Sequence, residues 1–562
     1  MCRSHAVLAV LLFFTFFPGP VQAYCPAEVS GETARGSVFL DANANHRRDG
    51  AEQGIAGVAV SNGCQVVLTD DQGNYEILLE PLQILFVSKP ADYQVPVDDN
   101  NVPRFYYRHY PEGTPDVVAG TSVAWLFPVT EPTGPLPDSI DFPLLALEDA
   151  DPVFRAHGFA DTQARQDLGQ DMLREELINP LIGNPHGVDF GLTVGDVVYD
   201  NLALYPRHRA MMGLMGIPQW YLPGNHDLNY ESPDAVFANE TYKRYFGPTY
   251  YSFNHGNVHF VMLNNVEYAG ADPGSGSGGY RGFLPEAQLQ WLARDLAHVP
   301  RDRLVVVASH IPLVTTAYDG KSDPASGPGT ENLHELLRIL EPFQQIYGLA
   351  GHDTSNSWKV QINHRHGWSG SPWIAHTLAE VRGNGWNTGP VDARGVRDAM
   401  MQDGNPNGYY VLHFDDDSLV PEFLPFPSGP DAGNRLRIVL DPPLVAPTGG
   451  GINRGYLRPA TRAVVNLFDG GERDRVWVSL DGGPRQQMDY TVRVDPYMER
   501  VFARYQHTVD AFGAPTRSAH LWELTLPDNL GTGLHHLRVF TEDEFGQRRQ
   551  ASLTFEVLAA GN

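Results

Sequence analysis

The stretch GLTVGDVVYDN, residues 191–201, decides the fold of the central part of this 562-residue chain. Its apolar half stops at Gly195, and Asp196 follows at once. A short apolar run bounded by glycine and a polar residue is typical of a buried strand that leaves the core. Three more apolar runs end in the same way: QWYLPGNHD (219–227), LVVVASH (304–310) and YGLAGH (347–352). These stretches predict strands with polar side chains at their carboxyl ends.

Helical patterns lie between these strands. They are RQDLGQDMLREELINPLI (165–182), PEAQLQWLARDLAHV (285–299) and TENLHELLRILEPF (330–343). Strands that alternate with helices predict a layered α/β domain, which we place at residues 150–415. In such folds, polar groups gather at the carboxyl ends of the strands, where the loops leave the core.

The polar residues at these strand ends need a partner. Asp196, Asn225, His310 and His352 would each place a polar group against the core. Burying such a group costs free energy unless it is paired. A shared cation resolves the difficulty, and mixed oxygen and nitrogen ligands suit Mn, Fe, Zn or Mg rather than a thiolate-bound metal.

Both flanks of this domain have the pattern of all-β domains. Residues 24–145 contain short alternating runs such as GSVFL and YEILLE, separated by Gly, Asn and Asp. Short strands return in residues 416–562, after a proline-rich boundary, with RVWVSLDG and HHLRVFT among them. The pattern predicts a β-sandwich on each side, the second one immunoglobulin-like.

A separate metal signal lies in the first flank. The stretch DANANHRRDGAE, residues 41–52, has oxygen-bearing residues at the spacing of an EF-hand loop, but His46 stands where that loop has glycine. We expect structural calcium here, and the alternative is an Asn- and Asp-rich turn. The expected ligands are Asp41, Asn43, Asn45, the Arg47 carbonyl, Asp49 and Glu52.

The N-terminus has the features of a transport signal. Arg3 and His5 precede an apolar run at residues 6–17, and a small residue, Ala23, follows the Pro-Gly-Pro break. The pattern predicts a cleaved signal peptide over residues 1–23 and an exported protein, periplasmic or extracellular. The alternative is a membrane anchor, but the run is shorter than the ~20 residues that span a bilayer.

Cysteine usage agrees with export. Cys2 lies in the signal, so Cys25 and Cys64 are the thiols that remain. In an oxidising compartment we expect them to form one disulfide, and the alternative is two unrelated buried thiols.

The charge balance limits the partners. The formal net charge is −27. Sequence-independent binding to a nucleic-acid backbone needs clustered Lys and Arg, so we expect no nucleic-acid polymer as partner.

The order GD, GNHD, H and GH resembles that of the calcineurin-like metallophosphoesterases. The wider frame is similar in YYSFNHGNVHFVMLNN (250–265), GFLPEAQLQWLARDL (282–296) and RDAMMQDGNPNGYYVLHF (397–414). The flanks look like the N- and C-terminal domains of an exported branch of that family. The resemblance implies a multidomain fold in which a central α/β domain, a β-sandwich layered with helices, is flanked by two all-β sandwich domains.

The resemblance also implies a ligand set for two divalent or mixed-valence transition metals. Asp196 would bridge the pair. Asn225, His310 and His352 would hold the second metal, and Asp161, in FADTQAR, the first.

The same resemblance implies a catalytic histidine. His226 would face the scissile phosphate as general acid or charge stabiliser, oriented by Asp227. Two cations a few ångströms apart neutralise phosphate and ionise a bridging water, and this metal-bound hydroxide attacks phosphorus in line. The leaving alkoxide needs a proton, which a His–Asp pair can supply.

Two departures from the family pattern fall at the first metal. Gln163 and Thr354 stand where the family often has histidine. Gln163 could add a carbonyl oxygen. Tyr199 is a second candidate, because purple acid phosphatases also lack the first-motif histidine and bind their first metal through a tyrosine at this spacing. The alternative for Tyr199 is a core tyrosine that caps the sheet. Three further residues lie near in sequence but match no motif position: Asp353, His364 and His366.

We therefore expect an exported metal-dependent phosphoesterase. The alternative is a calcium-bound surface or binding protein with a degenerate phosphoesterase domain. The intact GNHD motif favours the enzyme, because binding alone does not require His226 and Asp227 beside a metal. The substrate is left open among phosphomonoesters and phosphodiesters of small molecules, lipids or glycans, as is the oligomeric state.

Overall fold

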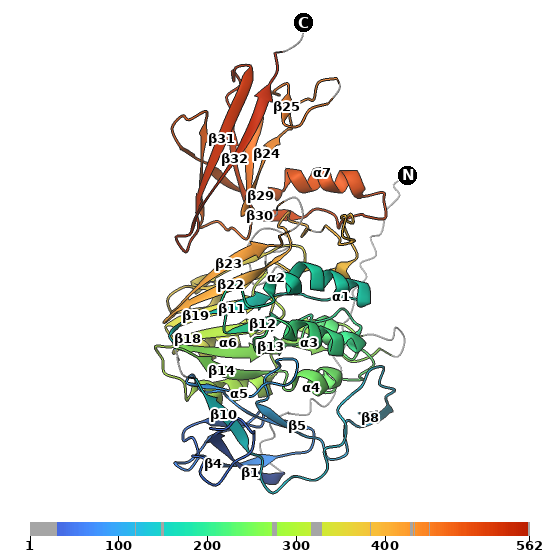
Figure 1. Ribbon diagram of the computed structural model, residues 1–562, viewed down its shortest axis with the longest axis vertical. Coiled ribbons are helices and arrows are strands. Elements are labelled where there is room, and N and C mark those ends of the chain that lie inside the picture. The colour runs from blue at the N-terminus through green and yellow to red at the C-terminus, as the bar shows by residue number, and fades with distance from the viewer. Residues whose placement is uncertain are drawn as a thin grey trace, which may run out of the picture.

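The computed structural model describes residues 31–118, 120–147, 151–272, 278–315, 329–382, 384–398, 400–427, 431, 433–448 and 450–559. These residues form three units stacked along the long axis of the molecule (Figure 1). The predicted signal peptide and Cys25 lie outside the described residues, so neither the signal nor the Cys25–Cys64 disulfide is tested. None of the described helices is long and apolar enough to cross a membrane.

The N-terminal unit has two four-stranded sheets. The first has the order β4 (Asn74–Leu79), β1 (Glu32–Leu40), β10 (Phe142–Ala146) and β6 (Tyr93–Gln94). The second has the order β3 (Val66–Leu68), β2 (Ala59–Ser61), β5 (Gln83–Val87) and β7 (Tyr106–His109), and a ribbon of β8 (Val117–Val118) and β9 (Thr121–Ser122) follows. Its core continues into that of the central unit, since Phe105 lies 5.1 Å from Trp220 between ring centroids.

The central unit contains a five-stranded and a six-stranded sheet packed face to face. The first has the order β13 (Gln219–Leu222), β12 (Phe190–Val194), β11 (Val153–Phe159), β22 (Gly408–Asp415) and β23 (Ser418–Pro425). The second has the order β14 (Tyr251–His255), β15 (Val258–Leu263), β18 (Leu304–Ser309), β19 (Gln345–Ala350), β21 (Trp373–Thr377) and β20 (Trp358–Ile362). Their inner faces meet at aromatic pairs such as Phe190–Phe260, 5.5 Å apart.

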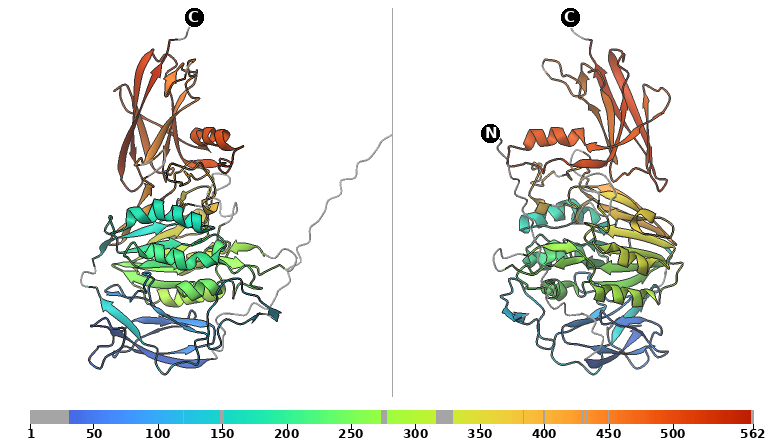
Figure 2. Two further views of the ribbon diagram at one scale, coloured as in Figure 1. Left: turned by 45° about the vertical axis from the view of Figure 1, so that its right-hand side comes forward. Right: turned by 180° about the vertical axis from the view of Figure 1, so that it is seen from behind.

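Helices cover the outer face of each sheet (Figure 2). In α6, apolar residues recur at the three- and four-residue spacing of a single face, and all four of them are buried: Leu333, Leu336, Leu337 and Leu340. The five-stranded sheet packs against α1 (Asp167–Leu173), η1 (Arg174–Ile178), α2 (Asn179–Leu181) and α3 (Tyr205–Gly213). The six-stranded sheet packs against α5 (Glu286–Leu296) and α6 (Leu333–Leu340).

Shorter elements occupy the loops of the central unit. They are η2 (Leu202–Leu204), η3 (Asn225–Asp227), α4 (Glu240–Phe246), β16 (Val266–Tyr268), β17 (Tyr280–Gly282), η4 (His364–His366) and η5 (Asn384–Trp386). The strands β11, β12 and β13 are parallel, as are β15, β18, β19 and β21. The carboxyl ends of parallel strands meet at one edge, which brings the polar residues that follow them together.

The C-terminal unit also contains two sheets. One has the order β24 (Leu436–Asp441), β26 (Arg462–Leu467), β30 (Arg517–Thr525) and β29 (Asp489–Val494). The other has the order β25 (Arg454–Gly455), β32 (Arg548–Val557), β31 (Gly533–Glu542), β27 (Arg475–Leu480) and β28 (Gln486–Gln487). One helix, α7 (Pro496–Tyr505), lies beside them.

The predicted fold class is confirmed, but one boundary is wrong. The sequence placed the end of the central domain at residue 415, because a proline-rich stretch beyond it suggested a domain boundary. The structure extends the central sheet through β23, which pairs with β22 from Gly408–Pro425 to Asp415–Ser418. Pro421 and Pro425 are tolerated because β23 is an edge strand, where proline costs no ladder bond.

Candidate metal centre

Five strands of the central unit end near one another, so the residues that follow them lie close together. Asp161 comes after β11, Asp196 after β12, Asn225 after β13, His310 after β18 and His352 after β19. Asp161, Asp196, Asn225 and His310 are each no more than 2% exposed. Among the described His, Cys, Asp and Glu residues, those with ligand atoms within 4.8 Å of one another are Asp196, His310 and His352.

The predicted second-metal ligands converge closely. Asn225 Oδ1 lies 3.0 Å from His310 Nε2 and 2.7 Å from His352 Nδ1, and the two ring nitrogens are 3.3 Å apart. Asp196 Oδ1 lies 3.2 Å from His310 Nε2. Ligands bound at about 2.1 Å to one cation and at right angles lie about 3 Å from each other. These four residues therefore fit a single transition-metal ion.

The tautomer of His310 supports that fit. Its Nδ1–H donates to the Val194 carbonyl oxygen over 2.9 Å, which leaves the Nε2 lone pair facing Asn225 and Asp196. A backbone carbonyl behind a histidine is a common outer partner in metal sites, where it fixes the ring and its tautomer.

The predicted first-metal ligands are also adjacent, although they form a different set. Gln163 Nε2 donates to Asp161 Oδ1 over 2.9 Å and to Asp196 Oδ2 over 3.3 Å. The Gln163 Oε1 atom is buried and has no hydrogen-bond partner. Rotation of this amide would turn its oxygen toward the two carboxylates, where only a cation could satisfy all three groups. The donor set thus fits a hard, oxygen-rich metal position.

Backbone geometry around the centre leaves no room for larger side chains. A Cβ atom on Gly224 would lie 2.1 Å from Asp196 Oδ1, and one on Gly195 would lie 2.3 Å from His310 Nδ1. Three of the ligand residues adopt positive φ: Asp161 at 54°, Asp196 at 47° and His352 at 71°. Such strain costs about 1–3 kcal/mol per residue and persists at functional sites that the surrounding structure holds in place.

The buried carboxylates of Asp161 and Asp196 favour a positive charge between them. Burial raises the pKa of Asp161 to about 7, and the neighbouring Asp196 adds to the effect. Burial lowers the pKa of His310, but the Asp196 and Asp161 carboxylates outweigh it and raise this pKa to about 9. Burial, followed by the proximity of His310, lowers the pKa of His352 to about 3. A bound cation would neutralise the carboxylates and keep both imidazoles unprotonated as ligands.

His226 lies at the open edge of the centre, with its side chain 20% exposed. Its Nδ1–H donates to Asp200 Oδ1 over 2.7 Å, and Nε2 lies 4.0 Å from Asp196 Oδ2. Burial lowers the pKa of His226, but Asp196 and Asp200 outweigh that effect and raise it above its ordinary value. The imidazole thus has one nitrogen held by Asp200 and the other directed toward the ligand cluster.

The predicted partner of His226 was wrong. Asp227 is fully buried and accepts hydrogen bonds from the Val197, Val198 and Gly224 amides and from the Tyr205 hydroxyl. It clamps the turn after β12 to the turn after β13. Sequence adjacency suggested Asp227, but in the tight turn of η3 neighbouring side chains point apart.

The residue that orients His226 is Asp200, which the sequence analysis missed. The available signal was an acidic residue four positions after Asp196 in the same strand-end loop, GDVVYDN. The Asp200 carboxylate is half exposed and lies against the outer nitrogen of His226.

Tyr199 stacks on His226. The ring centroids are 3.7 Å apart with an interplanar angle of 23°, and the Arg165 guanidinium carbon lies 4.0 Å from the Tyr199 centroid. Within the described residues, the Tyr199 hydroxyl makes no hydrogen bond to Asp161, Gln163 or Asp196. Its predicted role as a metal ligand stays a prediction.

The remaining sequence candidates have other partners or lie in another element. Asp353 Oδ1 accepts from the Ser355 amide and hydroxyl and from the Asn356 amide, so it closes the turn after His352. His364 and His366 belong to η4, beyond β20.

Three family models match the chain. The model of calcineurin-like phosphoesterase matches residues 157–398. The models of the N terminal and the C terminal of calcineurin-like phosphoesterase match residues 42–118 and 376–548. No curated protein matches this chain.

Among solved structures, the chain is similar to a purple acid phosphatase isolated from yellow lupin (Lupinus luteus) seeds. The sequence identity is 13% and the TM-score 0.33. The alignment covers 70% of this chain and 66% of that chain, just under two thirds of its length.

A buried carboxylate, amide and imidazole cluster at the ends of parallel strands defines the class of a metal-dependent hydrolase. The chain belongs to the calcineurin-like phosphoesterases and carries the N- and C-terminal domains of that family. This family implies hydrolysis of phosphoric ester bonds at a dinuclear metal centre.

Proposed function

We propose that this protein is exported and hydrolyses a phosphate monoester or diester, with His226 as the proton donor to the leaving group. One observation carries the proposal: Asp161, Asp196, Asn225 and His310 are buried together, His310 lies within 3.2 Å of both Asp196 and Asn225, and His226 stays partly open beside them. Ester cleavage requires both a metal-ligand cluster and an accessible histidine beside it, whereas binding alone does not require the histidine.

Each residue has a distinct task in the proposed reaction. Asn225, His310 and His352 would hold the second metal, Asp161 and Gln163 the first, and Asp196 would contact both. Cations bound there would supply charge neutralisation of the phosphate and activation of the attacking water.

His226 performs the proton transfer. Its Nε2 faces the centre while Nδ1 is held by Asp200, so the proton on Nε2 points toward the leaving oxygen of a bound ester. The carboxylate of Asp200 stabilises the protonated ring before transfer. Tyr199 fixes the plane of the imidazole by stacking against it.

A metal and substrate panel tests the proposal. The purified protein is stripped with a chelator, reloaded with Mn²⁺, Zn²⁺, Mg²⁺ or Fe, and assayed on phosphomonoesters and phosphodiesters of small molecules, lipids and glycans. We expect hydrolysis that disappears on stripping and returns on reloading. Metal binding with no hydrolysis of any ester would support a degenerate, non-catalytic domain instead.

We also propose that residues 41–52 bind calcium. Asp49 Oδ2 accepts hydrogen bonds from the side-chain amides of Asn43 and Asn45, so these three groups face one point. His46 adopts φ 63°, the conformation that glycine provides in an EF-hand loop. Calcium should raise the melting temperature of the wild type but not of an Asp41→Ala, Asp49→Ala variant. An equal response in both proteins would remove this assignment.

Export and the disulfide can be tested together. The mature N-terminus of the secreted protein should begin near residue 24, and the protein should contain no free thiol until it is reduced. Retention of residues 1–23, or two titratable thiols in the unreduced protein, would contradict these two expectations respectively.

A further inference from the structure

The loop that follows the metal ligand His352 ends buried between the central and C-terminal units. Asn356 and Ser357 are 1% and 0% exposed. The loop leads directly into β20, so its position depends on what covers it. Its neighbours are the residues around 403 and the start of β30, which belongs to the C-terminal unit.

The backbone and side chains of the loop bond to Asp403, which precedes β22 of the central unit, and to the C-terminal unit. The Ser355 carbonyl accepts a hydrogen bond from the Asp403 amide over 3.0 Å and one from the Thr516 hydroxyl over 3.3 Å. The Asn356 side-chain amide donates to the Arg517 carbonyl over 3.0 Å. Residues 355 and 356 are thus attached to the start of β30 in the C-terminal unit.

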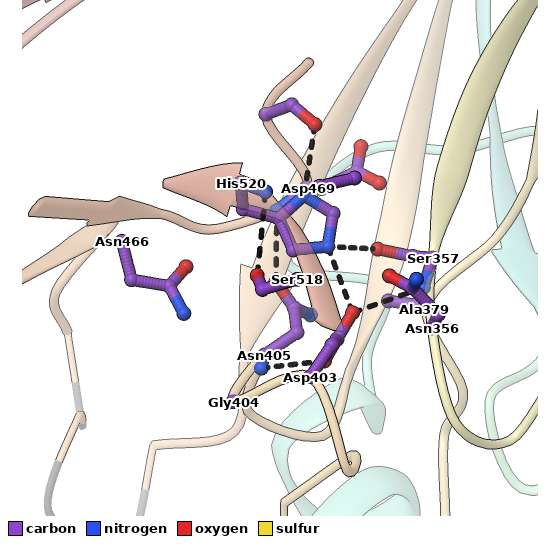
Figure 3. A network of polar contacts seen from close by, with 12 residues as sticks. Asn356, Ser357, Ala379, Asp403, Gly404, Asn405, Asn466, Asp469, Ser518 and His520 are labelled. Carbon is purple, nitrogen blue, oxygen red and sulfur yellow. Dashed lines mark hydrogen bonds and ion pairs between the residues drawn. The ribbon is translucent and has the colours of Figure 1, made fainter. Parts of the chain in front are cut away.

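His520, in β30, completes the attachment (Figure 3). Its Nδ1–H donates to the Gly470 carbonyl over 2.8 Å, and its Nε2 lies 2.8 Å from Asp403 Oδ2 and 3.2 Å from Ser357 Oγ. The Ser357 amide donates to the same Asp403 oxygen over 3.2 Å. His520 and Asp403 are both fully buried, so each needs the other as partner.

This attachment continues to the metal centre. His352 holds a positive φ of 71°, and its amide donates to Asp161 Oδ2 over 3.0 Å. A non-glycine residue keeps such a conformation only where both neighbouring segments are fixed. On one side, the Gly351 amide donates to the His310 carbonyl. On the other side lies the 353–357 loop, which is held by the C-terminal unit.

We propose that the C-terminal domain is a structural part of the metal centre and that His520 is a positioning residue, which acts through Asp403 and Ser357 on the loop carrying His352. The inference rests on the second-metal assignment made above. The C-terminal domain then has a function at the hydrolytic centre. Without it, the loop that carries the metal ligand His352 is not held rigidly in place.

The test compares two buried histidines at the same domain boundary. His520→Ala removes the attachment of the loop. His376→Ala is the matched control, because His376 Nε2 bonds to Asp469 of the C-terminal unit over 3.0 Å and Nδ1 to the Tyr347 hydroxyl, outside the 352–357 loop. Both changes remove one buried His–Asp pair between the two domains.

The readout is zinc retention by the full-length protein against a graded chelator series, with zinc per chain measured by mass spectrometry. We expect His520→Ala to weaken zinc at the second position roughly tenfold, the low end of what outer partners of metal ligands contribute. His376→Ala should lower the melting temperature but leave zinc retention unchanged. Excess zinc should restore the turnover of His520→Ala, and its Co²⁺ form should show altered d–d bands.

Two further variants keep the inference testable if His520→Ala does not fold. Ser357→Ala and Asn356→Ala each delete one contact of the loop and should weaken zinc in the same direction by smaller factors. Equal zinc retention in wild type and all three loop variants would overturn the inference. If wild type itself retains zinc no better than Asn225→Ala, the second-metal assignment fails instead, so the two failures can be told apart.

Discussion

The two halves of the metal centre are built differently. The second-metal half has two histidines and an asparagine, whose donor atoms lie 2.7–3.3 Å apart. The first-metal half contains Asp161 and Gln163, and the glutamine donates hydrogen bonds where the family often has a histidine ligand. The shared residue Asp196 contacts both sets.

The difference indicates two metals of unequal affinity. Imidazole ligands favour Zn and similar ions, whereas carboxylate and amide oxygens favour Mg, Mn or ferric iron. The second-metal half is also supported from outside, by the Val194 carbonyl behind His310 and by the loop after His352. We therefore expect a firmly held metal at the second position and an exchangeable one at the first.

The largest effect should follow loss of a second-metal ligand. Asn225→Ala removes the oxygen that contacts both His310 Nε2 and His352 Nδ1. We expect the tightly held metal and at least about a thousandfold of kcat/KM to disappear together, since metal stabilisation of the transition state supplies several kcal/mol. Metal analysis and kinetics on one preparation check this. Full activity at unchanged metal content would contradict the ligand assignment.

The next largest effect separates chemistry from metal binding. His226→Ala should lower kcat roughly 10²–10⁴-fold on an alkyl ester, the usual contribution of general acid catalysis. An aryl phosphate with a good leaving group should lose less, because it needs no proton. Metal content should hardly change in either half. Equal losses on both substrates would assign His226 to charge stabilisation.

Asp200→Asn should have a smaller effect through the same histidine. Asp200 helps to raise the pKa of His226, so its removal moves that pKa back toward the ordinary value. Less of the ring is then protonated at neutral pH, and the basic limb of the kcat–pH profile shifts to lower pH. We expect about a tenfold loss of kcat with KM and metal content unchanged.

Asp227→Asn is the contrasting variant. It should destabilise the fold instead, because it loosens the turn whose four donors bond to Asp227.

The smallest effect should come from Tyr199→Phe. The phenyl ring keeps the stack on His226, and the lost hydroxyl contacts none of the first-metal residues in the described structure. We expect less than about a threefold change in kcat, the scale of one weak contact. If the wild type has a visible charge-transfer band and Tyr199→Phe abolishes it, tyrosinate binds ferric iron. The first-metal half would then have a ligand comparable to the histidines of the second-metal half.

The parts of the site that follow from strand periodicity could be predicted from the sequence. Asp196, Asn225, His310 and His352 each end an apolar run, and parallel strands carry such ends to one edge. The partner of His226 could not be predicted, because η3 turns Asp227 inward and places Asp200 opposite the ring, a matter of local φ and ψ.

The domain boundary shows a second limit of sequence patterns. Proline occurs at domain boundaries and in edge strands alike, so the proline-rich stretch beyond residue 415 predicted a boundary where β23 forms the edge of the sheet. The contribution of His520 is a third case. It lies in another domain, more than 160 residues from Ser357, and no local pattern connects the two.

The unequal affinity of the two halves is tested most directly by removing metal stepwise from the loaded protein with a graded chelator series. For wild type we predict two metals per chain that leave in two separate steps, with the first position emptied first. For Gln163→His with Thr354→His, which supplies the two histidines common in the family, the weaker step should move toward the stronger one, most of all for zinc. Loss of both wild-type metals in a single step, unaltered by the double substitution, would contradict the account.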